Sequence, residues 1–386
     1  MADIAVQIFR SLGELTPYAA RYDALAAAGD PLPPTVRFEP LADFLHAFAP
    51  KAKLTTVVVS RDERWLAALP LVHGRIARGL LPVARLPSND WTHCGDLLLD
   101  QAAEPEALAA LVGQVRRAKL PLLWFNGIDH AAPRWTQFLA EGARVGLARN
   151  LAPQFEVARI TVPRDFVAVR AAWSRNLRQK LNKLDRKSRE LPGFRYEVWA
   201  APDDLREATD PMEIARPLTR EEVAPQLGRA FTAEDRSWKG AAGTSVLRAP
   251  GIWEFHRRQA ESLTVRAALQ LHLLCVGDAV MSFALMLRGP RVMYPVKIGY
   301  DEAFSQHSPG LLLFFHMLRR LAATGEAETI DCMGPISDLT SRWPGERYTV
   351  SRLVAAPRRI LPRMTLALYR GWRRLKITRG SNAAQH

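Results

Sequence analysis

Apolar residues in the first half of the chain follow helical and strand-like spacings in turn. Residues 1–50 show helical spacing that prolines interrupt. Residues 53–74 predict two strands around a polar turn, and residues 79–99 continue as strand and loop. Residues 104–118 predict a helix with acids at its start and bases at its end, and residues 121–128 predict a buried strand.

The second half of the chain repeats this order. Residues 268–301 predict three strands joined by Gly-Asp and Arg-Gly-Pro turns. Residues 308–325 predict a helix that ends at Gly325, and residues 328–334 predict the following strand. Because hairpin, strand, helix and strand occur twice, the pattern favours two tandem α/β domains of one kind, joined near residue 165.

These patterns set the expected fold class and domain limits. The fold class is α/β (α+β), with two tandem domains that each contain a mixed, mainly antiparallel sheet flanked by helices. The expected segments are a domain over 1–164, a basic connecting helix over 165–192, a second domain over 193–356, and a basic tail over 357–386.

The connecting helix has one apolar face and an otherwise basic surface. The basic surface is either a solvated one or a lid or docking surface for an anionic ligand. The apolar face consists of Trp173, Leu177, Leu181, Leu184 and Leu191.

Composition indicates a buried globular protein that attracts anions. The chain has 386 residues, is 48% hydrophobic and carries a net charge of +14. Its three cysteines, Cys94, Cys275 and Cys332, are far apart with no ligand spacing, so neither disulfides nor a metal site are expected. The start lacks a signal-peptide pattern and no apolar run is long enough to span a membrane, so we expect a cytoplasmic protein.

The basic tail contains eight Lys or Arg residues and no acid. Met364, Leu368, Trp372 and Leu375 would share one helical face. Such a segment fits peripheral contact of residues 358–379 with an acidic membrane surface, contact with RNA phosphates, or a helix packed on the domain.

The stretch around residues 292–325 has features of an anion-binding strand, loop and helix. Pro295 lies inside a strand pattern, which predicts an edge or a bulge. Ser308 fits a helix N-cap and Pro309 the first helical position, while Gly310 allows close approach of a ligand to the backbone. A helix N-terminus favours phosphate, although the same residues also make an ordinary helix start.

Several of these stretches resemble one protein family. The segments 173–190, 237–245 (SWKGAAGTS), 294–318 (YPVKIGYDEAFSQHSPGLLLFFHML) and 330–334 (IDCMG) look like the BioF2-like (CelD/FemAB-type) acyltransferases of the GNAT superfamily. The first half, through residues 57–74, also resembles the N-terminal domain of that family. The resemblance therefore covers most of the chain.

The resemblance implies a site for acetyl-CoA or a longer acyl-CoA as co-substrate. The loop 306–312 would hold the pyrophosphate, and the thioester would lie against strand 294–298. The first domain has no Pro-Gly helix start at the matching place, so it is expected to bind no CoA. The implied CoA-binding residues are Val296, Ile298, Gln306, His307, Ser308, Gly310 and Leu311, and the implied substrate residues are Trp238, Tyr294 and Tyr300.

Candidate catalytic residues follow from the needs of acyl transfer, which are a route for the acceptor's proton and donors for the oxyanion. Lys297 would hold an anionic substrate or the oxyanion, and Lys239 would lie near the acceptor; otherwise both are solvated lysines. Asp331 is a candidate base, because burial would raise its pKa. Weaker base candidates are Asp301, Glu254, His256 and His307.

The expected function is a CoA-dependent N- or O-acyltransferase that acts in the cytoplasm on an amino sugar or another cell-envelope or polysaccharide precursor, without a metal. Only Gly310 remains of the usual GNAT glycine-rich loop, and Arg342 stands where a lysine is usual. An aminoacyl-tRNA-dependent transferase of FemAB type therefore stays open. So does a non-catalytic scaffold in polysaccharide export, at the inner face of the membrane.

Overall fold

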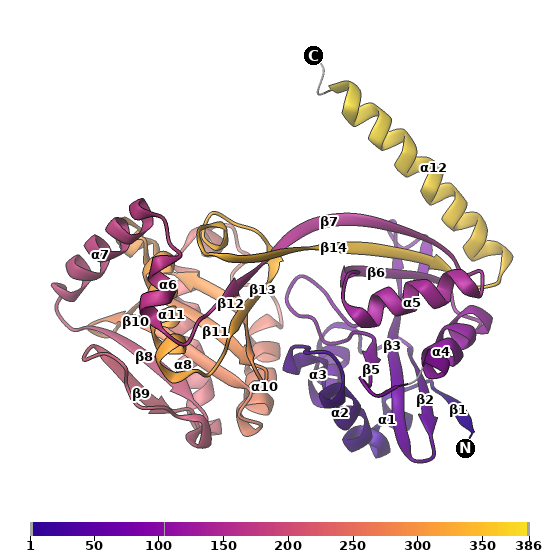
Figure 1. The fold of residues 1–386 in the computed structure, drawn as a ribbon, viewed down its shortest axis with the longest axis horizontal. Coiled ribbons are helices and arrows are strands. Elements are labelled where there is room, and N and C mark those ends of the chain that lie inside the picture. The colour runs from indigo at the N-terminus through magenta and orange to yellow at the C-terminus, as the bar shows by residue number, and fades with distance from the viewer. Residues whose placement is uncertain (1–2, 104, 384–386) are drawn as a thin grey trace. The chain divides into compact units, whose positions relative to one another are not determined.

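The computed structural model describes the backbone of residues 3–103 and 105–383 and the side chains up to residue 371. Contacts divide the chain into two compact units (Figure 1). Unit 1 comprises Met1–Phe155 and Thr349–His386, and unit 2 comprises Glu156–Tyr348. The described part contains no helix that is both long and apolar enough to cross a membrane.

Unit 1 has a mixed sheet in the order β1-β2-β3-β4-β6-β14, with the short β5 beside β3. Its helices pack the apolar faces of these strands into buried clusters. The strands are β1 (Ile4–Phe9), β2 (Leu54–Arg61), β3 (Arg64–Ile76), β4 (Leu81–Arg85), β5 (Leu98–Leu99), β6 (Leu122–Asp129) and part of β14 (Gly345–Ala356). The helices are α1 (Leu12–Leu15), η1 (Thr16–Tyr18), α2 (Ala19–Ala28), η2 (Pro34–Val36), α3 (Phe38–Phe48), α4 (Pro105–Arg117), α5 (Pro133–Arg144) and α12 (Ile360–Ala383).

Unit 2 has a mixed sheet in the order β7-β13-β12-β11-β10-β8-β9. Its strands are β7 (Ala148–Thr161, in part), β8 (Phe194–Ala200), β9 (Glu213–Pro217), β10 (Leu269–Val276), β11 (Ala279–Arg288), β12 (Val292–Tyr300) and β13 (Thr329–Pro335). Its helices are α6 (Phe166–Ala171), α7 (Arg175–Arg189), η3 (Pro202–Asp204), α8 (Arg220–Asp235), α9 (Trp238–Ala241), α10 (Ile252–Val265), η4 (Glu302–His307), α11 (Pro309–Thr324) and η5 (Thr340–Arg342).

The two units repeat one strand pattern, as the order of predicted elements indicated. In both units, an antiparallel hairpin is followed by a strand that forms a short parallel ladder with its neighbour in the sheet. In unit 1 the parallel partners are β4 and β6, and in unit 2 they are β12 and β13, with two residue pairs in each ladder. All other pairs except β8 with β9 are antiparallel among the described ladders, so the predicted mixed, mainly antiparallel sheets are confirmed.

Each unit completes its sheet with a strand that the chain delivers from the other unit. β6 pairs with β14, although the next strand after β6 in sequence is β7. β13 pairs with β7, although the next strand after β13 is β14. The chain therefore passes between the units within β7 and within β14. The units divide after Phe155 and after Tyr348, whereas the sequence suggested boundaries at residues 164 and 356.

The strand β1 corrects the expectation that residues 1–50 are helical. Ile4–Phe9 pairs along its whole length with β2, antiparallel. Five of its six residues are apolar, and so short a run does not separate a strand from a helix by periodicity. The hairpin β2–β3, the three strands β10–β12 and the helix that ends before Gly325 agree with the sequence-based expectations.

The expected connecting helix over 165–192 is two helices, α6 and α7, and the basic one, α7, begins at Arg175, two residues after Trp173. Ser174 caps it by accepting a hydrogen bond from the Leu177 N–H at 3.2 Å, so Trp173 lies before the first turn. The predicted apolar face is confirmed: Trp173, Leu177 and Leu181 are in the core of unit 2, and Leu184 and Leu191 pack against it.

Helices cover both faces of the central strands of unit 2. α11 lies on the face to which Ala284 and Met286 of β11 point. α8 lies on the opposite face, where Phe231 meets the Phe283 ring edge-on at 5.7 Å. Twelve of the sixteen residues of α11 are buried, including Arg320, whose guanidinium pairs with two buried carboxylates.

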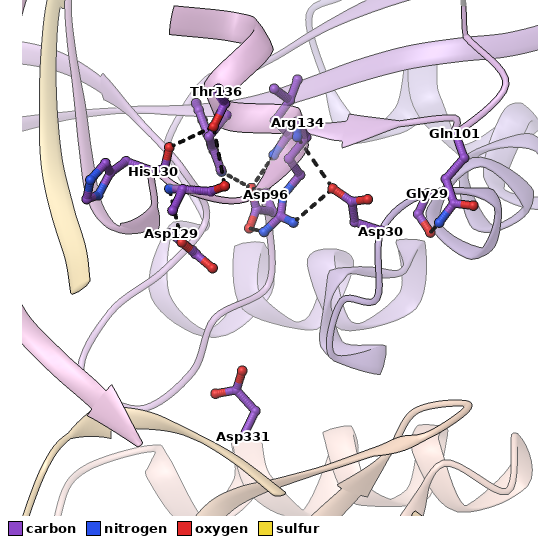
Figure 2. A network of polar contacts seen from close by, with 12 residues as sticks. Gly29, Asp30, Asp96, Gln101, Asp129, His130, Arg134, Thr136 and Asp331 are labelled. Atoms are coloured by element: carbon purple, nitrogen blue, oxygen red, sulfur yellow. Dashed lines mark hydrogen bonds and ion pairs between the residues drawn. The ribbon is translucent and has the colours of Figure 1, made fainter. Parts of the chain in front are cut away.

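Unit 1 contains a buried ion pair between Asp96 and Arg134 (Figure 2). Arg134 Nη2 donates to Asp96 Oδ2 at 3.0 Å, and Trp135 Nε1 donates to Asp96 Oδ1 at 2.8 Å. Burial alone would raise the pKa of the Asp96 carboxyl, but Arg134 and His93 hold that pKa well below its usual range. The pair joins the loop after β4 to the start of α5.

We expect Asp96→Asn to destabilise unit 1, because it leaves the Arg134 charge buried with less compensation. The loss should be about 3 kcal/mol, which lowers the melting temperature of a unit of this size by about 6 to 12 °C. Differential scanning calorimetry measures this shift, with the exposed Asp90→Asn as control.

The pH dependence of this effect has a defined sign. A carboxyl with a depressed folded-state pKa stabilises the fold above its unfolded pKa of about 3.9. That stabilisation is lost as the pH falls through the lower, folded-state pKa. The difference between wild type and Asp96→Asn should therefore shrink below about pH 4; a difference no larger than that of Asp90→Asn at neutral pH would contradict the role of the pair.

Candidate functional site

A β-bulge interrupts β12 where the sequence placed Pro295. Leu285 of β11 pairs with Lys297, whereas the next residue, Met286, pairs with Pro295. Val296 is thus the extra residue of the bulge. Proline has no N–H to give to the ladder, so the irregularity falls where a ladder hydrogen bond is already missing.

The other side of β12 loses its neighbour after a short parallel ladder. β12 pairs with β13 only through Val292 with Thr329 and Met293 with Ile330. On β13, Met333 has a left-handed backbone with φ of 51°. The pairing of β13 with β7 also shifts between Asp331 and Pro335. From residue 294 onward, backbone groups of β12 that point toward β13 have no partner in that ladder, and this is the edge at which the thioester was expected.

The segment after β12 is a short 3-10 helix that leads directly into α11. Asp301 begins η4 and accepts a hydrogen bond from the Ala303 N–H at 3.0 Å. Ser308 occupies the N-cap position of α11, as predicted, but its backbone is left-handed and its side chain makes no capping bond. Instead, the Ser282 hydroxyl of β11 donates to the Pro309 carbonyl at 3.1 Å and anchors the helix start.

The first turn of α11 offers few donors to an anion. Pro309 has no N–H, and the Leu311 and Leu312 N–H groups donate to the Ser308 carbonyl. No backbone bond of the described chain outside regular elements uses the Gly310 N–H. A Cβ on Gly310 would lie 3.6 Å from Leu339, an ordinary contact. The first turn of α11 therefore offers a ligand one backbone N–H, at Gly310, rather than several.

The remaining residues implied for CoA binding differ in accessibility. Gln306 is exposed and His307 is half-buried, so both side chains reach solvent near the helix start. Val296 and Ile298 are half-buried, and Ile298 packs on the core. The Leu311 side chain is buried in that core, so only its backbone would face a ligand.

A buried glutamate brings the two candidate lysines together. Glu234, at the end of α8, has a fully buried side chain. Its Oε1 lies 2.8 Å from Lys239 Nζ and 3.1 Å from Lys297 Nζ, and its Oε2 accepts from the Val246 N–H at 3.0 Å. The lysines come from α9 and β12, so one carboxylate connects three elements of the site.

The charged groups in this cluster shift one another's pKa values. Burial alone would raise the pKa of Glu234, but Lys239 and Lys297 hold that pKa below its ordinary value. Burial lowers the pKa of Lys297; Glu234 opposes this change, and the charge of Lys239 adds to it. Lys297 is the more buried of the two lysines, with a side chain that is 13% exposed.

Two glycines permit this close approach. A Cβ on Gly299 of β12 would lie 2.5 Å from the Phe283 ring and 3.2 Å from Glu234 Cβ, so only glycine lets α8 pack this close to the strand. A Cβ on Gly240 of the Trp-Lys-Gly stretch would lie 1.7 Å from the Asp235 carbonyl oxygen. Gly240 therefore allows α9 to fold back on the end of α8 and to place Lys239 on Glu234.

The three aromatic residues implied for substrate contact have different surroundings. Trp238 is 62% exposed at the start of α9, beside Lys239. Tyr300 is half-buried, and burial together with Glu302 raises the pKa of its phenol. Tyr294 is buried, and its ring lies against Gly289, so the side chain belongs to the interior.

Asp331 is part of a buried hydrogen-bond set in unit 2. Its Oδ2 accepts from Arg159 Nη2 at 3.1 Å, and its Oδ1 accepts from the Tyr348 hydroxyl at 2.8 Å and the Met333 N–H at 3.1 Å. These hydrogen bonds fix the turn of β13. They leave little free acceptor capacity for a general base.

The weaker base candidates have structural surroundings. Asp301 caps η4 and lies 3.4 Å from Arg236. Glu254 is exposed and pairs with Arg257, while His256 on the same helix is buried. Burial, reinforced by the charge of Lys297, lowers the pKa of His256 to about 3.

Glu234 is the site residue that sequence reasoning missed. A glutamate that precedes the Trp-Lys-Gly stretch by a few residues was the available signal. Its burial, which makes a cationic partner necessary, was not visible in the sequence.

Comparisons with known proteins agree on the fold. Residues 175–343 match a family model described as an acetyltransferase (GNAT) domain. The chain is similar to the crystal structure of FemX, with a TM-score of 0.55 and 11% identity over 86% of this chain and 95% of that chain. None of the curated protein sequences compared matches the chain.

Two further structures are similar over most of their length. One is the C-terminal domain of a putative lysylphosphatidylglycerol synthetase from Agrobacterium fabrum, with a TM-score of 0.51 and 13% identity over 88% of this chain and 91% of that one. The other is a conserved protein of unknown function from Bacteroides thetaiotaomicron, with a TM-score of 0.50 and 10% identity over 92% and 99%. The chain thus has a FemX-like GNAT fold, and the GNAT-domain match supports an acyltransferase, as the resemblance implied.

We expect Glu234→Gln to increase the reactivity of Lys297 toward acetic anhydride. Removing the carboxylate removes the interaction that raises the pKa of Lys297, so more of its amine is neutral at a given pH. Each unit of pKa lost raises the neutral fraction about tenfold while the pH is below the pKa. Mass spectrometry of the labelled peptide gives the rate, with Asp235→Asn as the neighbouring control; an unchanged rate would contradict the coupling.

We expect Gly240→Ala to destabilise unit 2, because its Cβ would overlap the Asp235 carbonyl. The matched control is Gly228→Ala within α8, where a Cβ has open space. That change should be neutral or stabilise by up to about 1 kcal/mol, since alanine favours helices over glycine. Urea unfolding distinguishes the two variants, and equal stability would show that α9 does not depend on this contact.

Proposed function

We propose that this protein is a cytoplasmic CoA-dependent N- or O-acyltransferase that acts on an amino sugar or another cell-envelope or polysaccharide precursor. The observation that carries the proposal is the combination in unit 2 of a bulged β12, an interrupted β12–β13 ladder and the start of α11 directly after β12. The GNAT-domain match over residues 175–343 supports it.

Residues of this chain suit the binding of an acyl-CoA. The edge of β12 from residue 294 would accept the pantetheine and acyl portion through backbone groups that β13 does not pair. The Gly310 N–H, the exposed Gln306 and the half-buried His307 would meet the pyrophosphate at the start of α11. Acyl-CoA supplies an activated thioester, whose carbonyl carbon bonds to the acceptor nitrogen or oxygen as its C–S bond breaks.

Lys297 is proposed to stabilise the negative charge that develops on the carbonyl oxygen. Its ammonium is on β12 and is largely shielded from water, where an electrostatic contact is strong. Burial lowers the pKa of Lys297, and Glu234 opposes that change. The acceptor's proton would leave to solvent, and the thiolate would take a proton from solvent, because Asp331 has little free acceptor capacity.

The acceptor is proposed to contact α9. The exposed indole of Trp238 offers an apolar face that stacks on a sugar ring, and Lys239 offers a cation for a neighbouring phosphate or carboxylate. The 27% exposure of the Lys239 side chain leaves it accessible while it stays bonded to Glu234.

The first test of this function is calorimetric titration with acetyl-CoA and CoA. We expect micromolar binding that Gly310→Trp abolishes, since an indole would fill the approach to the first-turn amide. Gly228→Trp, in open space on α8, should bind normally. If the wild type binds neither compound nor a longer acyl-CoA but binds charged tRNA, the donor is an aminoacyl-tRNA; if it binds none of them, a scaffold role replaces the enzyme.

We expect Lys297→Met to slow acyl transfer about 100-fold, the usual cost of removing one oxyanion donor. Acetyl-CoA affinity should change little, because the ammonium acts on the transition state. Release of free CoA thiol in the presence of a panel of amino sugars measures the rate. Lys119→Met, an exposed change in unit 1, is the control, and an equal loss of affinity and rate would assign Lys297 to binding instead.

A further inference from the structure

The start of α12 has two different faces. One face packs on unit 1 through Pro362 and Leu366, which are buried, and through Tyr369, whose ring meets Trp124 edge-on at 5.2 Å. Arg370 also donates a hydrogen bond to the Arg149 carbonyl. These contacts hold the described part of the helix in a fixed orientation on unit 1, so its opposite face is presented consistently.

The opposite face is apolar and exposed. Leu361, Met364 and Leu368 follow at spacings of three and four residues and are 74%, 58% and 74% exposed, and Ile360 beside them is 78% exposed. The other exposed large apolar side chains of the described chain are scattered along it, at Val6, Leu80, Leu151, Val167, Trp238, Leu247 and Val265. A concentrated stripe of this kind marks an interaction surface.

Arginines border the apolar stripe. Arg358, Arg359 and Arg363 are exposed and line, with Ile360 and Leu361, a concavity of about 560 Å³. No Asp or Glu occurs after Glu346, so residues 347–371 contribute no negative side chain to this face. The predicted apolar positions Trp372 and Leu375 lie outside the residues whose side chains are described.

We propose that this face of α12, together with Arg358 and Arg359 just before the helix, docks on the surface of an anionic lipid bilayer. The aliphatic side chains enter the boundary between headgroups and acyl chains, and the three arginines pair with lipid phosphates. The apolar stripe favours a bilayer over a nucleic acid: phosphates of RNA would engage the arginines but would leave four aliphatic side chains in water. This inference does not depend on acyl transfer.

Vesicle binding of the full chain tests the proposal. The wild type should co-sediment with phosphatidylcholine vesicles that contain phosphatidylglycerol, and only weakly with phosphatidylcholine alone. Changing Arg358, Arg359 and Arg363 together to Gln should lower the partition coefficient roughly 100-fold, about fivefold for each charge. Leu361→Asn and Leu368→Asn should each lower it about tenfold, since burial of a leucine contributes that much.

A matched variant separates this face from the overall positive charge. Changing the exposed Lys180, Lys183 and Lys187 of α7 to Gln removes the same charge elsewhere and should lower vesicle binding far less. An equal loss in this variant, or no binding by the wild type, overturns the proposal.

Two other results would also overturn it by identifying a different occupant. One is binding of an RNA duplex that the arginine variant loses while vesicles do not bind. The other is a dimer without lipid that the leucine variants convert to monomer. Circular dichroism of each variant confirms that the fold is intact.

Discussion

The parallel ladder between β12 and β13 ends after two residue pairs, and the geometry of unit 2 follows from this. On β12, Pro295 lacks a donor and Val296 is an extra residue, so the strand cannot keep an even register. On β13, the Asp331 side chain bonds the N–H of Met333, whose backbone is left-handed. Residues within each strand thus end the ladder. The backbone groups of β12 that face β13 beyond Met293 have no partner in this ladder.

On the face of β12 that α8 covers, two lysines share one carboxylate, that of Glu234. Two ammonium groups that approach one another repel, and burial makes that repulsion stronger. Glu234 offsets it for Lys239 and Lys297 together, but one negative charge cannot neutralise two positive ones. Counted at formal charges, the three side chains carry one more positive than negative charge, and Lys297 is only 13% exposed. Positive charge in a shielded place suits an oxyanion or a phosphate. The glycines at 240 and 299 are what allow the backbones to come close enough.

Features with local causes were predictable from the sequence. The bulge at Pro295, the start of α11 near Pro309 and its end at Gly325 each depend on the conformational limits of one residue, and all three are present. The apolar face of α7 also follows from spacing alone.

Features that depend on distant residues were not predictable. The pairing of Glu234 with two lysines brings together a helix end, a turn and a strand. The strand β1 exists because β2 offers an edge to it, which a pattern of six residues does not reveal. Asp331 looked like a free carboxylate because its partners Arg159 and Tyr348 are remote in sequence.

The exchange of β7 and β14 has a consequence for how the chain matures during translation. A nascent chain emerges from its N-terminus, so β6 would be complete long before its partner, residues 349–356 of β14, leaves the ribosome. Until then the edge of β6 presents unpaired backbone groups that invite wrong partners. The first unit therefore cannot mature as an independent domain while the second is being made, and the whole sequence between β6 and β14 acts as one very long loop whose closure completes the sheet of unit 1.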